Sequence, residues 1–342
     1  MINLGKIKIG KNLPPVVIVD LGINHSGSLD KAIYLSDLAI KNGARIIKHQ
    51  THIAHEEMSV EAKKIIPGNA NSSIFSIIKR YSLSYGDEKK LMNYIKQKKC
   101  IFISTPFCKA AVDRLVEFKI PLFKIGSGEC NNYPLVEYIC SKRKPIILST
   151  GMNDIKSIAK SVKIIRKYKI PYALLHCTNI YPTPPHLVRL EAMLELKKNF
   201  KDAIIGLSDH TETIFTSLGA VSLGASLVEK HFTDNKKSKG PDMSASLDPK
   251  ELNELTNGFK IIFSSMKGKK KAVKEEKKTI AFAFASIAST KIIKKGDIFT
   301  KDNIFPLRPG NGFFKIKDFN KILGKKAKRN IYKGFQLTRK DV

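Results

Sequence analysis

Two histidines, each placed shortly after an apolar run, could do chemistry in this chain. His210 follows the run at 203–207, and His231 follows the run at 226–228. A helix-like segment separates the runs, so we expect two neighbouring parallel strands whose ends meet at one edge of a sheet. Two imidazoles there, with Glu229 beside them, could bind a divalent metal that keeps open coordination positions. The alternative is that each histidine caps its strand or bonds a loop carbonyl, and these residues alone favour neither.

Polar residues also follow the other apolar runs of the chain. They are Lys48, Gln50, Thr105, Lys124, Ser127, Glu129, Ser149, Asn179, Tyr181 and Ser208. Two lysines with several hydroxyls in one cavity would suit a small phosphorylated anion. Carboxylates and histidines beside them would suit a divalent cation and proton transfers. A single lysine in such a place is more often a solvated surface residue, but a purely structural rim has no need for the whole set.

The elements that must position these residues follow a regular rhythm. Eight apolar runs read as buried parallel strands, and they lie at 16–19, 45–47, 101–103, 122–123, 145–148, 172–175, 203–207 and 226–228. Amphipathic helical patterns follow nearly all of them, such as one with Ser28 as its N-cap and one that Asn153 is expected to cap. This repetition predicts a (β/α)₈ TIM barrel. A doubly wound open sheet is the alternative, but the chain has no Gly-x-Gly-x-x-Gly phosphate turn.

The pattern changes twice along the chain. Residues 53–85 form a longer insertion after the second strand, and such insertions often cover an active site. We expect the barrel to occupy residues 1–266, a charged linker residues 267–280, and a small, mostly β domain residues 281–342. So small a domain has a marginal core, which predicts that it packs on the barrel or on a partner chain.

Composition narrows the possible classes of protein. The net charge of +31 is compatible with a non-catalytic basic protein that binds nucleic acid, but the lysines are spread along the chain without a recognised motif, which favours a lysine-rich surface. The five cysteines form no Cys-x-x-Cys pair, so buried reduced thiols are expected. No apolar run is long enough to span a membrane. The first residues lack the apolar segment of a signal peptide, so we expect a cytoplasmic location.

Many ordered motifs of this chain resemble those of the bacterial sialic acid synthases. The matching segments lie at 22–28, 48–52, 66–69, 124–132, 148–152, 177–184, 206–210, 229–233 and 240–242. Near the C-terminus, Arg308-Pro309-Gly310-Asn311-Gly312 resembles a loop of the antifreeze-like (SAF, β-clip) domain of the same family. The likeness covers nearly the whole chain.

This resemblance implies an activity. Members of the family condense phosphoenolpyruvate with N-acetylmannosamine and water, giving N-acetylneuraminate and phosphate with C–O cleavage. The same chemistry on a related sugar, giving legionaminic or pseudaminic acid, is the alternative. The segments at 48–52 and 66–69 look more like the N-acetylneuraminate type. The resemblance also implies a domain-swapped homodimer.

The resemblance implies roles for individual residues as well. Phosphoenolpyruvate would be held by Lys48, Thr105, Lys124, Ser127, Ser149, Asn179 and Ser208, with Tyr181 spanning both substrates. The open-chain sugar would meet Gln50, Asn69, Phe107, Glu129 and Asp242, while Arg308 would reach in from the other subunit. His210 and His231 would bind Mn²⁺ by preference, or Mg²⁺. The catalytic set would comprise Glu129, Glu229, Asp20, Lys124 and Tyr181.

Three positions depart from the family's pattern. Asp20 stands where these synthases usually carry glutamate, so its carboxylate is one methylene shorter. Lys230 replaces a common arginine between Glu229 and His231, a mild change if its side chain faces outward. Met243 stands where many members have histidine or isoleucine, which bears on the choice of sugar.

Overall fold

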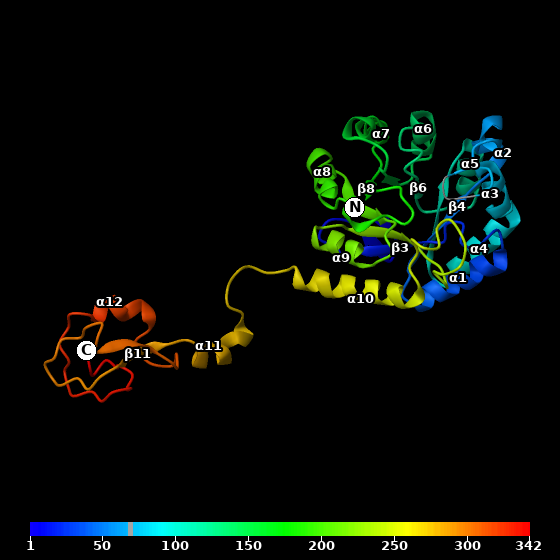
Figure 1. Cartoon of the computed structure of the whole chain (residues 1–342). Coiled ribbons are helices and arrows are strands. Elements are labelled where there is room, and N and C mark those ends of the chain that lie inside the picture. The colour runs from blue at the N-terminus through cyan, green and yellow to red at the C-terminus, as the bar shows by residue number, and fades with distance from the viewer. Residues whose placement is uncertain (68–70) are drawn as a thin grey trace. The chain divides into compact units, whose positions relative to one another are not determined.

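The computed structural model describes residues 1–67 and 71–342 and shows the eight predicted strands closed into a parallel barrel. The strands follow chain order around it, with the last pairing with the first: β3 (Val16–Asp20), β4 (Ile46–Thr51), β5 (Ile101–Pro106), β6 (Phe123–Ile125), β7 (Ile146–Ser149), β8 (Tyr172–Cys177), β9 (Ile204–Asp209) and β10 (Leu227–His231). Because all are parallel, their carboxyl ends lie at one rim of the barrel. The predicted TIM barrel is confirmed (Figure 1).

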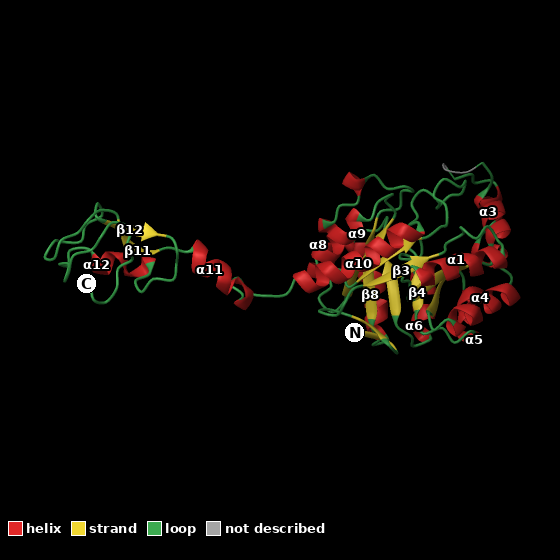
Figure 2. Cartoon of the chain, turned by 90° about the horizontal axis from the view of Figure 1, so that it is seen from below, coloured by secondary structure: helices red, strands yellow, loops and turns green. Residues whose placement is uncertain are grey.

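Helices wrap the outside of the barrel (Figure 2). They are α1 (Leu29–Lys41), α4 (Tyr85–Gln97), α5 (Lys109–Glu117), α6 (Tyr133–Ser141), α7 (Ile155–Lys167), α8 (Glu191–Asn199), α9 (Phe215–Ser222) and α10 (Pro249–Ser265). Their apolar stripes pack on the outward-facing strand residues in one continuous core. Short segments add to this layer, namely η2 (Pro185–Leu187) before α8, and α2 (Ala54–Glu57), η1 (Val60–Lys63) and α3 (Ile74–Tyr81) in the insertion after β4.

Helix capping agrees with the sequence in one case and differs in another. Ser28 caps α1 as expected, and its hydroxyl accepts a hydrogen bond from the Lys31 amide at 3.3 Å. The cap of α7 is Asp154, whose carboxylate accepts from the Ser157 amide at 2.7 Å, so the prediction of Asn153 was wrong by one residue. Asn153 instead donates to the Ser127 and Gly151 carbonyls, which ties this loop to the rim of the barrel.

An antiparallel hairpin at the N-terminus was not anticipated from the sequence. It consists of β1 (Ile2–Leu4) and β2 (Ile7–Ile9), with Ile2 opposite Ile9. Ile2 and Ile9 are fully buried and pack with inward-facing strand residues such as Ile18 and Ile103. The hairpin therefore completes the apolar interior of the barrel.

The chain divides into two compact units, Met1–Lys267 and Gly268–Val342. The second unit contains η3 (Lys274–Glu276), α11 (Lys277–Ala283), an antiparallel pair of β11 (Ser286–Ser289) and β12 (Ile304–Leu307), η4 (Ile316–Asp318) and α12 (Phe319–Ile322). It has its own apolar cluster around Ile287, Phe299 and Leu337. The segment expected to be a linker contains η3 and the start of α11. The predicted small, mostly β domain corresponds to this unit, in which β11 and β12 pair antiparallel.

Two further features concern the cysteines and the lengths of the helices. All five cysteines are free and buried, as expected for reduced thiols. Among the described helices, none combines the length and the apolar character that crossing a membrane would require.

Candidate active site

A cavity of about 330 Å³ lies at the carboxyl ends of the barrel strands. Each strand contributes to its lining: Asp20 from β3, Lys48 from β4, Thr105 from β5, Lys124 from β6, Ser149 from β7, Cys177 from β8, Ser208 from β9, and Glu229 and His231 from β10. The loops after the strands add Ser127, Glu129, Asn179, Tyr181, His210 and Asp242, and Gln50 and Phe107 also line it. Every predicted site residue among the described residues of the first unit therefore lines this cavity. The predicted Asn69 lies outside the described residues.

Two buried lysines and two buried carboxylates form a charge network at the base of this cavity. Lys48 Nζ lies 2.7 Å from Asp20 Oδ2 and 3.6 Å from Glu229 Oε1, and Lys124 Nζ lies 3.5 Å from the same Glu229 oxygen. Lys124 also donates to Ser149 Oγ at 2.8 Å. Because the side chains of both lysines are at most 3% exposed, their positive charge acts in a poorly solvated space. This end of the cavity is suited to an anion.

The pKa values of this network follow from burial and pairing. Burial opposes the ionisation of Asp20, but the Lys48 ammonium and His231 outweigh it and hold the pKa of the carboxyl well below its usual range. Burial likewise opposes the charge of Lys48, and Asp20 and Glu229 outweigh it, so its pKa is raised. Burial prevails at Lys124 and lowers its pKa despite the nearby Glu229. The shorter Asp20 side chain therefore reaches Lys48 and forms a tight ion pair.

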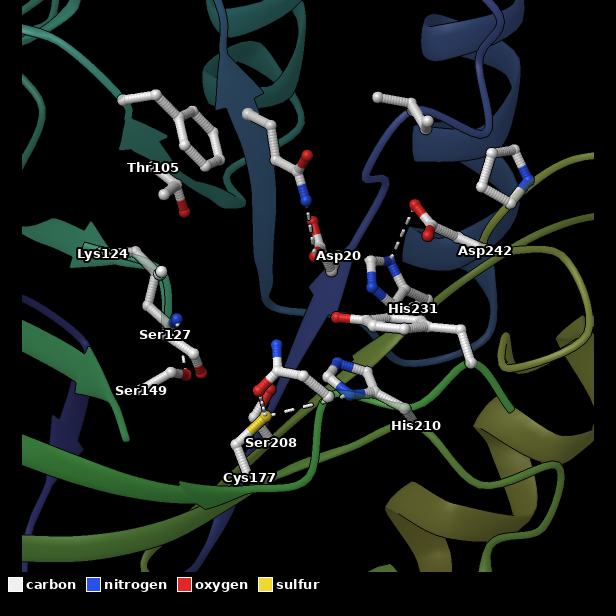
Figure 3. Close-up of a pocket in the computed structure, with 18 of the residues that line it drawn as sticks. Asp20, Thr105, Lys124, Ser127, Ser149, Cys177, Ser208, His210, His231 and Asp242 are labelled. Atoms are coloured by element: carbon white, nitrogen blue, oxygen red, sulfur yellow. Dashed lines mark hydrogen bonds and ion pairs between the residues drawn. The ribbon is translucent and has the colours of Figure 1, made fainter. Parts of the chain in front are cut away.

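The two predicted metal ligands face each other on the other side of the cavity. The ring centroids of His210 and His231 lie 5.5 Å apart, and Figure 3 shows both beside Asp242, across from Lys124 and Ser149. His210 Nδ1 lies 3.0 Å from the Thr178 carbonyl oxygen. Since a carbonyl only accepts, Nδ1 carries the proton and Nε2 keeps a free lone pair.

The environment of His231 also fits a cation. His231 Nδ1 is buried and makes no hydrogen bond to any described residue, although Asp20 Oδ2 lies 3.4 Å away and Asp242 Oδ2 3.9 Å away. Two imidazoles with nearby carboxylates are a donor set that a divalent metal accepts. Within residues 1–67 and 71–342, no group of three or more potential ligands is gathered around one point. A metal held by His210 and His231 would therefore have to complete its coordination with water and substrate.

Glu129 is placed differently from the other carboxylates. Burial raises the pKa of its carboxyl to about 7, so a large share of the group is neutral at physiological pH. The Glu129 carboxyl lies close to the backbone of Gly126, since a Cβ on that glycine would lie 2.8 Å from Glu129 Oε2. A carboxyl that gains or loses a proton near neutral pH can serve as a general acid or base.

Glu229 has one oxygen shared between the lysines and one without a partner. Its Oε1 also accepts from Ser208 Oγ at 3.4 Å, whereas Oε2 is buried and makes no hydrogen bond to the described residues. A buried carboxylate oxygen without a donor is costly unless a ligand or water completes it. Glu229 Oε2 is thus an available proton acceptor at the anion end of the cavity.

Among the lining residues that the sequence did not indicate are two with side chains able to do chemistry, His52 and Cys177. His52 stacks on Phe107 with ring centroids 4.1 Å apart, and its Nε2 lies 3.2 Å from Gln50 Oε1. Cys177 Sγ lies 3.8 Å from His210 Nδ1. Both residues stand at strand ends beside predicted ones, so their position along the chain was the signal that could have found them.

Lys230, whose replacement of arginine would be mild if the side chain faced outward, is not a solvated surface residue. Its side chain points away from the cavity, but it is fully buried and lies 3.4 Å from Asp209 Oδ2. Its ammonium donates to the Thr211 carbonyl at 2.6 Å. Strand alternation turns these two residues to the back of β9 and β10, where α9 covers them.

One predicted substrate contact lies in the second unit. Arg308 follows β12 and is exposed. Its contact with a substrate stays a prediction.

Comparisons with known proteins show which protein families and which individual proteins this chain is similar to. The NeuB family model matches residues 35–271, and the SAF domain model matches residues 284–342. An N,N'-diacetyllegionaminic acid synthase from Campylobacter jejuni is 39% identical over 332 residues, which cover 95% of this chain and 98% of that protein. The human N-acetylneuraminate-9-phosphate synthase is 32% identical over 257 residues, covering 74% of this chain and 72% of that protein.

A solved structure supports the same grouping. The N-acetylneuraminic acid synthetase of Leptospira borgpetersenii, crystallised with citrate, superposes with a TM-score of 0.74 at 31% identity. The match covers 82% of this chain and 94% of that one.

Proposed function

This chain belongs to the NeuB family, and from that premise we propose that it condenses phosphoenolpyruvate with an N-acetylated amino sugar to give a sialic-acid-type product and phosphate. One observation carries the proposal. A single cavity holds two buried lysines, several hydroxyls, two histidines and nearby carboxylates. Figure 3 shows Lys124 and Ser149 across from His210 and His231. Such an arrangement suits a phosphorylated anion placed against a polarised carbonyl.

The lysine side of the cavity would bind phosphoenolpyruvate. Lys48 and Lys124 supply the positive charge, and Thr105, Ser149 and Ser208 supply hydroxyl donors to its phosphate and carboxylate. In the reaction, C3 of phosphoenolpyruvate attacks the aldehyde carbon of the open-chain sugar and forms the new C–C bond. The lysines stabilise the negative charge that remains on phosphate when the C2–O bond breaks.

The carboxylates would handle the protons. Glu229 Oε2, which is buried and accepts no hydrogen bond from the described residues, takes a proton from the water that adds to C2. Glu129 in its neutral form donates a proton toward the sugar oxygen that the C–C step makes basic. Tyr181 packs against His210 with ring centroids 4.2 Å apart and so restrains the orientation of that imidazole.

His210 and His231 would hold a divalent metal, Mn²⁺ by preference or Mg²⁺. When bound, such a metal supplies Lewis-acid polarisation of the sugar aldehyde. The chain's own contribution is to fix the His210 tautomer through Thr178 and to keep Asp20 and Asp242 close to His231.

Two acceptor sugars are candidates. N-acetylmannosamine is the acceptor that the sequence analysis predicted, and its 6-deoxy diamino analogue would give a legionaminic-type product. The Campylobacter jejuni relative, named for N,N'-diacetyllegionaminic acid, favours the second candidate. So does an apolar wall on one side of the cavity.

Phosphate release tests the proposed function. We expect the protein with phosphoenolpyruvate, Mn²⁺ and either sugar to release phosphate in proportion to product. Chelation should abolish release, and added Mn²⁺ should restore it. His210→Ala should bind Mn²⁺ more weakly, as measured by electron paramagnetic resonance of the free ion. Absence of phosphate release with both sugars contradicts the synthase, and full turnover after chelation contradicts the role of the metal.

A further inference from the structure

The side of the cavity formed by the insertion after β4 is apolar. It is lined by Ile74, Ile77 and Ile78 of α3, by Pro67 before them, and by Phe107 after β5. The charged lining residues come from the strands and from the loops that follow them. The cavity therefore has two unlike regions, one built by the barrel and one built largely by this inserted helix.

Ile77 stands out among the three isoleucines of α3. Ile78 packs with Ala54 and Phe75 in a small apolar cluster that anchors the helix, and Ile74 packs against the same cluster. Ile77 is only 8% exposed but belongs to none of the apolar clusters formed by the described residues. Ile77 therefore contributes to the wall of the cavity without belonging to the cluster that anchors the helix.

Two of the polar side chains next to this wall, His52 and Gln50, are already engaged with each other. His52 stacks on Phe107, and its Nδ1 lies 3.0 Å from Glu57 Oε1. Gln50 Oε1 lies 3.2 Å from His52 Nε2, and Gln50 Nε2 donates to Asp20 at 3.4 Å. A further hydroxyl placed against the isoleucines would lose its water without gaining a partner from these groups.

The two ends of the sugar can be assigned from the chemistry of the cavity. On the proposed function, the aldehyde must lie between phosphoenolpyruvate and the two histidines, because the new bond forms there. If the opposite end of the open-chain sugar extends away from the strand ends, it meets the apolar wall to which α3 contributes. A C6 methyl group would suit this wall better than a C6 hydroxymethyl group.

We propose that the apolar face of α3, with Ile77 at its centre, selects acceptor sugars that lack the hydroxyl at C6. This inference rests on the proposed function and names the substrate class within it. An apolar site discriminates against an added hydroxyl by about 10- to 100-fold in kcat/KM.

A pair of acceptors that differ only at C6 tests the inference. These are N-acetylmannosamine and 2-acetamido-2,6-dideoxymannose, assayed by phosphate release with phosphoenolpyruvate and Mn²⁺. We expect kcat/KM to favour the 6-deoxy sugar by about 10- to 100-fold. Ile77→Thr, which places a hydroxyl in this wall, should reduce that preference at least severalfold, and Ile77→Val, which has the shape and volume of threonine without the hydroxyl, should keep it.

The outcomes separate this inference from the function beneath it. Phosphate release from both sugars with a kcat/KM ratio near one, or a ratio that Ile77→Thr leaves unchanged, overturns the inference alone. Absence of release from either sugar, and from the 2,4-diacetamido 6-deoxy sugar, overturns the proposed function and the inference with it. If thermal denaturation shows that Ile77→Thr does not fold, two other measurements test the inference. These are the kcat/KM ratio of the wild-type protein for the two sugars and the change of that ratio in Ile74→Thr.

Discussion

At the scale of single residues, the cavity separates its carboxyl groups by environment. Asp20 is held ionised by Lys48, whereas Glu129 lies without a salt-bridge partner among the described residues. Desolvation without a nearby cation raises the pKa of a carboxyl, and a close cation lowers it. Two carboxyl groups with pKa values pushed apart are the usual basis for distinct acid and base roles.

The titration of Glu129 gives a testable pH dependence. Burial raises its pKa to about 7, so the neutral acid predominates below that pH and disappears above it. If the neutral form donates a proton, kcat at saturating substrates should fall as pH rises through about 7. Glu129→Gln cannot titrate, so it should lose this limb of the profile and reduce kcat by about 10²- to 10⁴-fold. The same limb in Glu129→Gln would show that another group titrates.

At the scale of elements, the back of β9 and β10 is fixed by a buried ion pair. The Asp209 carboxylate accepts from the Thr216 and Ser217 hydroxyls at 2.7 and 2.6 Å and lies opposite Lys230 in the strand register. The neighbours of this pair along each strand are the residues that face the cavity. The buried pair therefore helps to fix the register of β9 and β10, and with it the positions of His210 and His231 at the ends of these strands.

Loss of the Lys230 ammonium should destabilise the barrel. Lys230→Met leaves the buried Asp209 charge uncompensated, and breaking a buried pair in this way costs about 3–5 kcal/mol. Lys230→Arg keeps the charge and should cost less. Chemical denaturation of the full chain, followed by circular dichroism, measures both. Equal free energies of unfolding for the two variants would mean that charge is not what this position supplies.

The N-terminal hairpin is a second element whose contribution can be measured. Ile9 is fully buried against inward-facing strand residues, while its neighbour Lys8 is exposed. Ile9→Ala removes buried apolar volume and should lower the free energy of unfolding by about 2–5 kcal/mol. Lys8→Ala is the matched control on the same strand and should change it little. A hairpin that merely rests on the surface would make the two variants equal.

At the scale of the whole molecule, the prediction that concerns two copies of the chain is the domain-swapped dimer. If Arg308 of one subunit completes the cavity of the other, Arg308→Ala and His210→Ala chains should each be inactive alone. Mixed by co-expression, they should recover about a quarter of wild-type activity, because half of the dimers are mixed and one of their two sites is complete.

The double variant serves as the control for this mixing experiment. A chain carrying both Arg308→Ala and His210→Ala should recover nothing when mixed with either single variant. Without recovery in the original mixture, Arg308 does not act on the partner's cavity.

The sequence alone determined the barrel and most of its cavity. Continuous apolar runs and period-3.6 helical patterns depend on local sequence, and in a parallel barrel they also place each strand end at one rim. Lys48, Ser149 and His231 could therefore be assigned to a common site from their positions along the chain.

Only the tertiary structure decided how those residues act on one another. The fully buried Lys230, the unpartnered Glu229 Oε2 and the raised pKa of Glu129 depend on what lies across space, and distant segments supply it. Ile77 gave no signal in the chain because an isoleucine on an amphipathic helix is usually a core residue. Its place in the cavity follows from the packing of α3 through Ile78 and Phe75, which no local pattern encodes.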